Sequence, residues 1–169
     1  MRFLILFAFL ISNCVAAEIK DIKNLVINKE LKKYDGLTFL DDQSNQIELN
    51  QFEGNLVLLN FWATWCAPCK DEMPSLDSLS ANPNFDNLKV FPINIGNDTN
   101  QKSLTFFEEL KIKNLEIYFD SPNTLAKKFK LRGLPTTILF NKDGLEFARI
   151  IGSINFVDEK FIKWLSNFN

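Results

Sequence analysis

Residues 55–76, "NLVLLNFWATWCAPCKDEMPSL", carry the change of pattern that decides the fold. The first eight of these residues form a nearly continuous apolar run, which is typical of a strand covered on both faces. From Cys66 onward the period changes, because Cys69, Met73 and Leu76 recur at i, i+4 and i+7 and so fall on one face of a helix. The sequence therefore predicts a buried strand that leads into a helix, with two cysteines at the junction.

Composition places the chain among ordinary globular proteins. It has 169 residues, of which 46% are apolar and 13% aromatic, so one domain with its own core is expected. The formal net charge is -2. This balance does not suit binding to a phosphate backbone, and we expect no nucleic-acid partner.

The first 17 residues, "MRFLILFAFLISNCVAA", have the order of a signal peptide. An early Arg2 precedes an apolar run, and small residues end the segment at Ala17. The apolar run is shorter than the roughly 20 residues that span a bilayer. We predict export followed by cleavage of residues 1–17, which implies a periplasmic location. An uncleaved anchor is one alternative, and lipid attachment at Cys14 is another, although Asn13 stands where a lipoprotein signal has a very small residue.

Beyond the signal peptide, residues 18–35 mix charges with loosely helical apolar spacing and are interpreted as a lead-in segment, and residues 36–169 as the domain. Two short alternating segments around a polar turn predict a hairpin within residues 37–50. The same reasoning gives these further elements: strands at residues 88–95, 115–119, 136–140 and 145–151, and helices at residues 99–110, 121–129 and 155–168. Alternating strands and helices followed by a hairpin and a last helix indicate an α/β sandwich with a mixed sheet.

Particular residues support these helices. The inward positions of the helix at residues 99–110 are expected to be Leu104, Phe107 and Leu110. Ser121 before Pro122 is expected to cap the next helix, whose buried stripe is Leu125, Ala126 and Phe129. Asn155 is expected to cap the last helix, with Val157, Phe161, Trp164, Leu165 and Phe168 on one face. Pro92 cannot donate to a sheet and counts against a central strand at residues 88–95.

Two nearby cysteines allow three kinds of chemistry. A zinc site lacks its other half, because the chain has no histidine and, once residues 1–17 are removed, no third cysteine. Covalent haem attachment needs a histidine where Lys70 stands, and an iron-sulfur cluster also lacks ligands. A site shared between subunits and a plain structural disulfide stay open, although so short a loop gains little from closure. We expect no metal and no cofactor.

The third possibility is a redox pair, and the local physics favours it. Cys66 lies where the helix begins, so free N–H groups and the positive end of the helix dipole stabilise its thiolate. Cys69 falls one turn later on the buried face and suits the resolution of a mixed disulfide. Pro68 restricts the intervening backbone, and Ala67 places no charge beside either sulfur.

Two motifs resemble a known family. "NFWATWCAPCKDEMPSL" and "RGLPTTILFNKDG", some 65 residues later, are similar to the thioredoxin superfamily and, within it, to exported TlpA/ResA-type thiol-disulfide oxidoreductases. The similarity runs from about Gly36 to the C-terminus. It implies a thioredoxin-like fold, with a mixed central sheet flanked by helices and an added N-terminal β-hairpin.

The resemblance also implies roles for individual residues. Cys66 and Cys69 would be the catalytic attacking and resolving thiols. Leu134 and Pro135 match the cis-proline turn that pairs with the substrate chain. The implied substrate-binding residues are Trp65, Ala67, Pro68, Leu134 and Pro135. Plain thioredoxin has a buried Asp and a Lys that move protons, and Asn60 and Pro92 stand at the matching positions. The proton for Cys69 must therefore come from water, from Cys66 or from the substrate.

These observations predict a periplasmic enzyme that reduces disulfides in exported client proteins. The resemblance suggests apocytochrome c or a copper assembly factor of cytochrome oxidase as client, and a membrane thiol-reductant transporter as electron donor. A disulfide-introducing oxidase and a redox-inert binding module are the alternatives. A peroxide-reducing enzyme is disfavoured, because Thr64 lies two residues before Cys66 and not the three of a Thr-x-x-Cys site.

Overall fold

The computed structural model describes residues 22–169, so the predicted signal peptide and its Cys14 lie outside the described residues. The elements occur in this order: β1 (Leu25–Lys32), β2 (Thr38–Leu40), β3 (Gln46–Glu48), η1 (Leu49–Phe52), β4 (Leu56–Trp62), α2 (Ala67–Ser80), β5 (Leu88–Asn94), α3 (Asn100–Glu109), β6 (Tyr118–Phe119), α4 (Thr124–Lys128), β7 (Thr136–Phe140), β8 (Glu146–Ile151), α5 (Glu159–Leu165) and η2 (Ser166–Phe168). Within residues 22–169, no helix combines the length and apolar character needed to cross a membrane.

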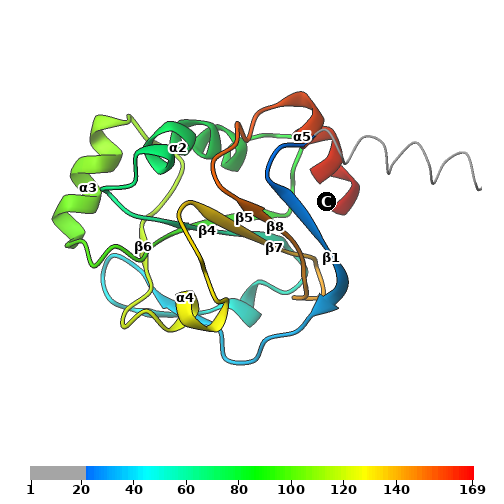
Figure 1. Ribbon diagram of the computed structural model, residues 1–169, viewed down its shortest axis with the longest axis horizontal. Helices are drawn as coiled ribbons and strands as arrows, with labels where there is room; N and C mark the ends of the chain where they lie inside the picture. Colours follow the sequence, from blue (N-terminus) through cyan, green and yellow to red (C-terminus); the bar gives the residue numbers. More distant parts are fainter. Residues whose placement is uncertain (1–21) are drawn as a thin grey trace, which may run out of the picture.

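One mixed sheet of eight strands organises the molecule, in the order β1-β8-β7-β4-β5-β6-β2-β3. The pairs β4–β5 and β5–β6 are parallel, and the other neighbours are antiparallel. Helices α2, α3 and α5 lie over one face of the sheet and α4 over the other (Figure 1). The predicted thioredoxin-like α/β architecture is confirmed.

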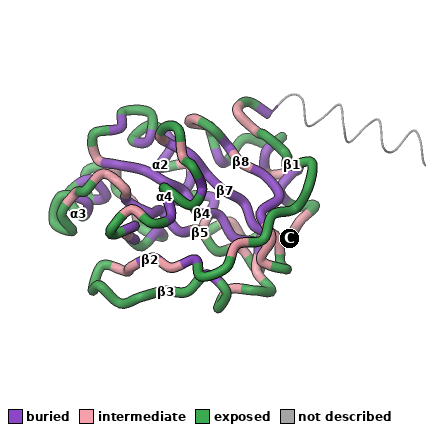
Figure 2. Tube along the Cα trace, turned by 60° about the horizontal axis from the view of Figure 1, so that its bottom comes forward, coloured by how far each residue is buried: buried purple, intermediate pink, exposed green. Residues whose placement is uncertain are grey.

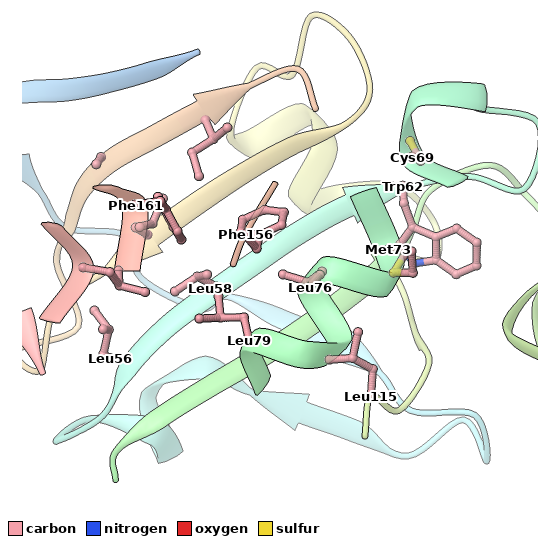
Figure 3. Packing of buried hydrophobic residues seen from close by; sticks show 14 of the residues in the cluster. Leu56, Leu58, Trp62, Cys69, Met73, Leu76, Leu79, Leu115, Phe156 and Phe161 are labelled. Carbon is pink, nitrogen blue, oxygen red and sulfur yellow. The ribbon is translucent and has the colours of Figure 1, made fainter. Parts of the chain in front are cut away.

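Strand β4 lies in the middle of this arrangement and is buried along its whole length (Figure 2). Its side chains alternate between two hydrophobic clusters. Leu56, Leu58 and Trp62 join the cluster under α2, α3 and α5, whereas Val57, Leu59 and Phe61 join the cluster under α4. In Figure 3, Met73, Leu76 and Leu79 of α2 lie over the first set. The apolar run predicted a strand covered on both faces for this reason, and the prediction is confirmed.

The predicted hairpin is also confirmed, as β2 and β3 pair from Thr38 opposite Glu48 to Leu40 opposite Gln46. Leu40 pairs in turn with Phe119 of β6, which places the hairpin at one end of the sheet. Strand β5 forms as predicted, despite Pro92. Since β6 pairs only with Ile93 and Asn94, the edge of β5 beside Pro92 has no partner strand within residues 22–169, and a missing N–H is tolerated there.

Part of the segment interpreted as a lead-in forms a strand, which was not predicted. Within residues 18–35, Leu25–Lys32 form β1, which pairs with β8 at the other end of the sheet. Most of its side chains are exposed, and its register with β8 is irregular between Ile27 and Lys32. A strand of this kind lacks the alternating apolar pattern that identifies a half-buried strand.

Helix α3 forms where it was predicted, but one of its buried positions differs from the prediction. Thr99 caps it by accepting a hydrogen bond from the Lys102 N–H. Leu104 was expected inward but is exposed, and Phe106 is buried in its place. The rings of Phe106 and Phe107 lie 4.8 Å and 5.4 Å from that of Trp62. Phe106 and Phe107 are buried because both pack against the large indole of Trp62. The helical period of the sequence does not reveal this contact between two elements.

Two predicted helix caps are wrong. Helix α4 begins at Thr124, three residues after Ser121, and the Asp120 carboxylate accepts hydrogen bonds from its backbone N–H groups at Leu125 and Ala126, at 2.9 Å and 2.7 Å. The N-cap residue itself is Asn123, whose side chain makes no capping hydrogen bond, so the Asp120 carboxylate satisfies these N–H groups from outside the helix. Its negative charge suits the positive end of the helix dipole. Helix α5 is capped by Asp158, not Asn155, so the exposed Val157 precedes the helix.

Strand β6 is shorter than predicted, since only Tyr118 and Phe119 pair within residues 115–119. The hairpin of β7 and β8 forms as predicted. In its turn Gly144 has φ +70°, a conformation that glycine adopts without strain.

A buried charge network fastens β1 to the sheet. The Glu146 carboxylate on β8 has no exposed surface and accepts hydrogen bonds from Arg149 at 2.8 Å, Asn28 at 2.7 Å and Tyr34 at 2.8 Å. Burial opposes its charge, but the hydrogen bonds, that from Arg149 first, lower the pKa of Glu146. Arg149 also donates to the carbonyl of Phe129 after α4, at 2.8 Å. The network thus joins β1, β8 and α4.

We expect Glu146→Ala to lower the free energy of unfolding by about 3 kcal/mol, because one partner of a buried pair would be left without the other. Lys32→Ala is the control, since the Lys32 ammonium lies 3.7 Å from the same carboxylate but is half-exposed. Its loss should cost less than about 1 kcal/mol. Urea unfolding of the oxidised protein at neutral pH measures both, and equal losses would contradict the assignment.

Candidate redox-active site

The two cysteines lie where β4 has ended and α2 begins. Cys66 is the N-cap of α2, with an extended backbone (φ -86°, ψ 100°), and its sulfur accepts a hydrogen bond from the Cys69 N–H at 3.3 Å. Pro68 occupies the first turn of the helix, where its missing N–H breaks no helical bond. The sulfur of Cys66 therefore faces the positive end of a helix of 14 residues, as the sequence predicted.

Cys66 and Cys69 are joined by a disulfide, so the structure shows the oxidised state. Cys66 is 5% exposed and Cys69 is 0% exposed. The difference has the predicted direction, although both residues are buried in this state. Of the two residues, only Cys66 retains any exposed surface, and Cys69 is covered by the protein.

The predicted substrate-binding residues fall into two groups around the disulfide. Trp65, which is 68% exposed, stands with the exposed Ala67 and Pro68 on the surface beside Cys66. Leu134 is half-buried and packs against the cluster that contains both cysteines. The peptide bond between Leu134 and Pro135 is cis, and Pro135 is buried. Substrate binding by these residues stays a prediction.

A carboxylate holds the turn that leads into Cys66. The side chain of Asp98, 2% exposed, accepts hydrogen bonds from the backbone N–H and the hydroxyl of Thr64, at 2.9 Å and 2.8 Å, and from Asn94 at 3.0 Å. Lys102 pairs with it at 2.7 Å. Burial opposes the charge of Asp98, but these hydrogen bonds, that from Lys102 first, lower its pKa to about 2. The turn is thus fixed by an ionised group.

Gly96 allows this turn to approach β5 closely. A Cβ at Gly96 would lie 2.7 Å from the Cβ of Ala63 and 2.7 Å from the carboxylate of Asp98. Any other residue at position 96 would therefore force Ala63 or the Asp98 side chain to move. Asp98 and Gly96 were not identified from the sequence, because a loop Asp and a loop Gly have many other uses.

The structure also contains a titratable group that the sequence analysis missed. Glu72 is 1% exposed and follows Cys69 by one turn on α2. Its carboxylate accepts hydrogen bonds from the Asn60 amide at 2.8 Å and from the Ile154 N–H at 3.3 Å. Asn60 and Pro92, which match the proton-moving Asp and Lys of plain thioredoxin but do not titrate, lie opposite each other in β4 and β5. Glu72, on the helix above them, supplies the buried acid that the sequence analysis did not find.

Two signals pointed to Glu72. Asn60 interrupts an apolar strand on the face of Leu58 and Trp62, and a buried amide requires a polar partner. Glu72 falls three residues after Cys69 and immediately before Met73, on the helix face that was predicted to be buried.

Burial raises the pKa of Glu72 to about 7, although hydrogen bonds from Asn60 and Ile154 oppose the shift. No positively charged side chain contributes to the shift. The Oδ1 of Asn60 is buried without a hydrogen-bond partner among the described residues. Rotation of the amide would let a protonated Glu72 donate to that oxygen, so the site can hold the acid in either form.

Comparison with known proteins agrees with this geometry. The model of the AhpC/TSA family matches residues 22–145. The chain is 30% identical over 132 residues to the thiol-disulfide oxidoreductase ResA of Bacillus cereus, which covers 78% of this chain and 73% of that protein. Against ResA of Bacillus subtilis the identity is 27% over 114 residues, covering 68% of this chain and 63% of that protein.

Solved structures share the fold. A DsbF homologue from Corynebacterium diphtheriae superimposes with a TM-score of 0.70 at 22% identity, covering 87% of this chain and 94% of that one. StoA from Bacillus subtilis gives a TM-score of 0.63 at 28% identity, covering 77% and 97%.

The raised pKa of Glu72 predicts a pH dependence of stability. Its pKa is about 7 in the folded protein against 4.5 for an ordinary glutamate. Between these values the folded state binds more protons than the unfolded state, so stability falls as pH rises. From about pH 5 to about pH 8, wild type should lose about 2 kcal/mol relative to Glu72→Gln.

Urea unfolding of the oxidised proteins at the two pH values measures this difference. Glu109→Gln is the matched control, since its carboxylate is 60% exposed, and it should follow wild type. A wild-type curve parallel to that of Glu72→Gln would show that Glu72 is ionised throughout.

Proposed function

This chain belongs to the AhpC/TSA family and is a ResA-type thiol-disulfide oxidoreductase, and we propose that it reduces disulfides in exported client proteins in the periplasm. One observation carries the proposal. The Cys66–Cys69 disulfide lies at the first turn of α2, with the sulfur of Cys66 on a helix N–H group. In the reduced protein the same surroundings favour a Cys66 thiolate, which is the species that attacks a disulfide.

The reaction consists of two exchanges. The Cys66 thiolate attacks one sulfur of the client disulfide, so a bond between Cys66 and that sulfur forms, the client bond breaks, and the other client sulfur leaves as a thiolate. Cys69 then loses its proton and attacks the sulfur of Cys66. The disulfide between Cys66 and Cys69 forms, and the second client sulfur is released. Two electrons pass from the protein to the client, and the two client thiolates take up two protons, one that came from Cys69 and one from the solvent.

Glu72 is the group we assign to the proton of Cys69. The two residues are one turn apart on α2, and both are buried. With a pKa of about 7, Glu72 is divided between its two forms near neutral pH, as a group that accepts and returns a proton must be. This route adds a protein acid to the three proton sources expected from the sequence, which were water, Cys66 and the substrate.

The reducing direction follows from the residues between the cysteines. Ala67 and Pro68 carry no charge, and a histidine there would have stabilised the reduced state and made a stronger oxidant. The client, such as apocytochrome c or a copper assembly factor of cytochrome oxidase, and a membrane thiol-reductant transporter as electron donor follow from the family resemblance. The periplasmic location is supported by the signal-like order of residues 1–17.

We expect Cys69→Ser to accumulate a mixed disulfide with a disulfide-bearing client peptide, because the second exchange has no thiol. Cys66→Ser is the control and should accumulate none, since Cys69 is covered. Mass spectrometry under non-reducing conditions detects the adduct. Adducts on Cys69 in the control would reverse the two roles.

The redox potential of the Cys66/Cys69 pair tests the direction. Equilibration with glutathione should give a value well below about -200 mV, whereas a value near about -120 mV would indicate a disulfide-introducing oxidase.

Alkylation of the reduced protein, measured as a function of pH, tests the remaining alternative, a redox-inert module. An apparent Cys66 pKa at or above about 8.5 would favour that module.

A further inference from the structure

The segment between α4 and the cis-proline turn is strongly basic. Within residues 127–132, "KKFKLR", four of the six side chains are cationic, and all four are exposed. The chain as a whole carries a net charge of -2. The proposed chemistry at Cys66 and Cys69 uses none of these cations, so their concentration at one place calls for another explanation.

Residues 128–132 of this segment line one side of a cleft of about 550 Å³. The cations in its wall are Lys32, Lys128, Lys130, Arg132 and Arg149. The apolar part of its wall is formed by Val26, Phe129, Leu131 and Ile151. Among the described residues that line it, none is acidic. The cleft is therefore positive and partly apolar.

The structure already compensates some of these charges. Arg149 is paired with the buried Glu146 at 2.8 Å, and Lys32 lies 3.7 Å from the same carboxylate. Lys128 donates to the backbone carbonyl of Asp35. Within residues 22–169, the side chains of Lys130 and Arg132 have neither a hydrogen bond nor an ion pair. These two cations are available to a partner.

The cleft reaches the catalytic end of the sheet. Thr136, in its wall, immediately follows Pro135 and pairs with Phe61, five residues before Cys66. Ile151, also in the wall, pairs with Thr136 and is 53% exposed. A chain that binds beside the disulfide can thus continue from the cis-proline turn into the cleft.

We infer that this cleft binds an acidic segment of the client polypeptide, adjacent to the client disulfide. The inference rests on the proposed function and names the substrate class of that site. Carboxylates of the client would face Lys130 and Arg132, and its apolar side chains would contact Val26 and Ile151. Such pairing raises the association rate more than it strengthens the final complex.

The shape of the cleft favours a polypeptide over the other anionic partners. A membrane surface contacts projecting side chains, whereas Arg149 and Thr136 line a hollow. A small free anion would leave most of about 550 Å³ and the whole apolar wall unused. An extended chain with carboxylates and some apolar side chains matches both parts of the wall.

Three peptides with the same internal disulfide, flanked by runs of glutamate, glutamine or lysine, test the inference. At low salt, we expect the reduced protein to show kcat/KM about tenfold higher for the glutamate peptide than for the glutamine peptide. At about 1 M salt the ratio should approach one, because charges are screened within about 3 Å. The double variant Lys130→Glu with Arg132→Glu should prefer the lysine peptide.

A double variant with the same change of net charge is the control. Lys89 and Lys142 are exposed and lie outside the cleft, so Lys89→Glu with Lys142→Glu should keep the wild-type ratio. Equal rates on all three peptides, or an unchanged ratio in the Lys130/Arg132 variant, would overturn the inference. Loss of the preference in the Lys89/Lys142 variant would reduce it to an effect of net charge.

Two further measurements separate other failures. If none of the peptides is reduced, the proposed function fails, and binding of the same peptides with serines in place of cysteines still tests the cleft. Co-sedimentation with vesicles that contain phosphatidylglycerol tests a membrane partner. Vesicle binding that Lys130 and Arg132 control, without any preference among the peptides, would assign the cleft to lipid.

Discussion

The structure depends on a strand that is buried on both faces and leads into a helix through a fixed turn. Because β4 is enclosed between two hydrophobic clusters, its C-terminal end has one position, and the start of α2 is set by it. The N–H of Cys69 then points at the sulfur of Cys66. Asp98 holds the intervening turn through Thr64 from the side of β5. The reactivity of one sulfur thus follows from packing along a whole strand.

The interior beside this junction contains two buried polar side chains, those of Asn60 and Glu72, and burying them lowers the stability of the fold. Glu72 and Asn60 are buried, and the pKa of Glu72 is raised because its charge is poorly solvated there. Unlike the buried Glu146, which is paired with Arg149, Glu72 has no cationic partner that lowers its pKa. Under the proposed function, this acid, one turn from Cys69 on α2, serves the exchange chemistry at the expense of some stability near neutral pH.

Much of this could be predicted from residues whose patterns are local. The apolar run of β4 and the period of Cys69, Met73 and Leu76 identified the central strand, the helix and the cysteine pair. Strand β1 could not be predicted, because an exposed edge strand leaves little apolar alternation. The caps of α4 and α5 were predicted at Ser121 and Asn155, but the first N–H groups of these helices donate to Asp120 and Asp158, and of the two only Asp158 is itself the N-cap residue.

Both ends of the sheet are poor templates for another strand. The edge strand β3 has only three residues, and β1 carries exposed Lys29, Glu30 and Lys32 along an irregular register. Short and charged edges discourage the addition of foreign strands. Under the proposed function, the molecule binds client chains whose backbone groups can be unpaired. With its borders closed in this way, co-aggregation with such chains is disfavoured.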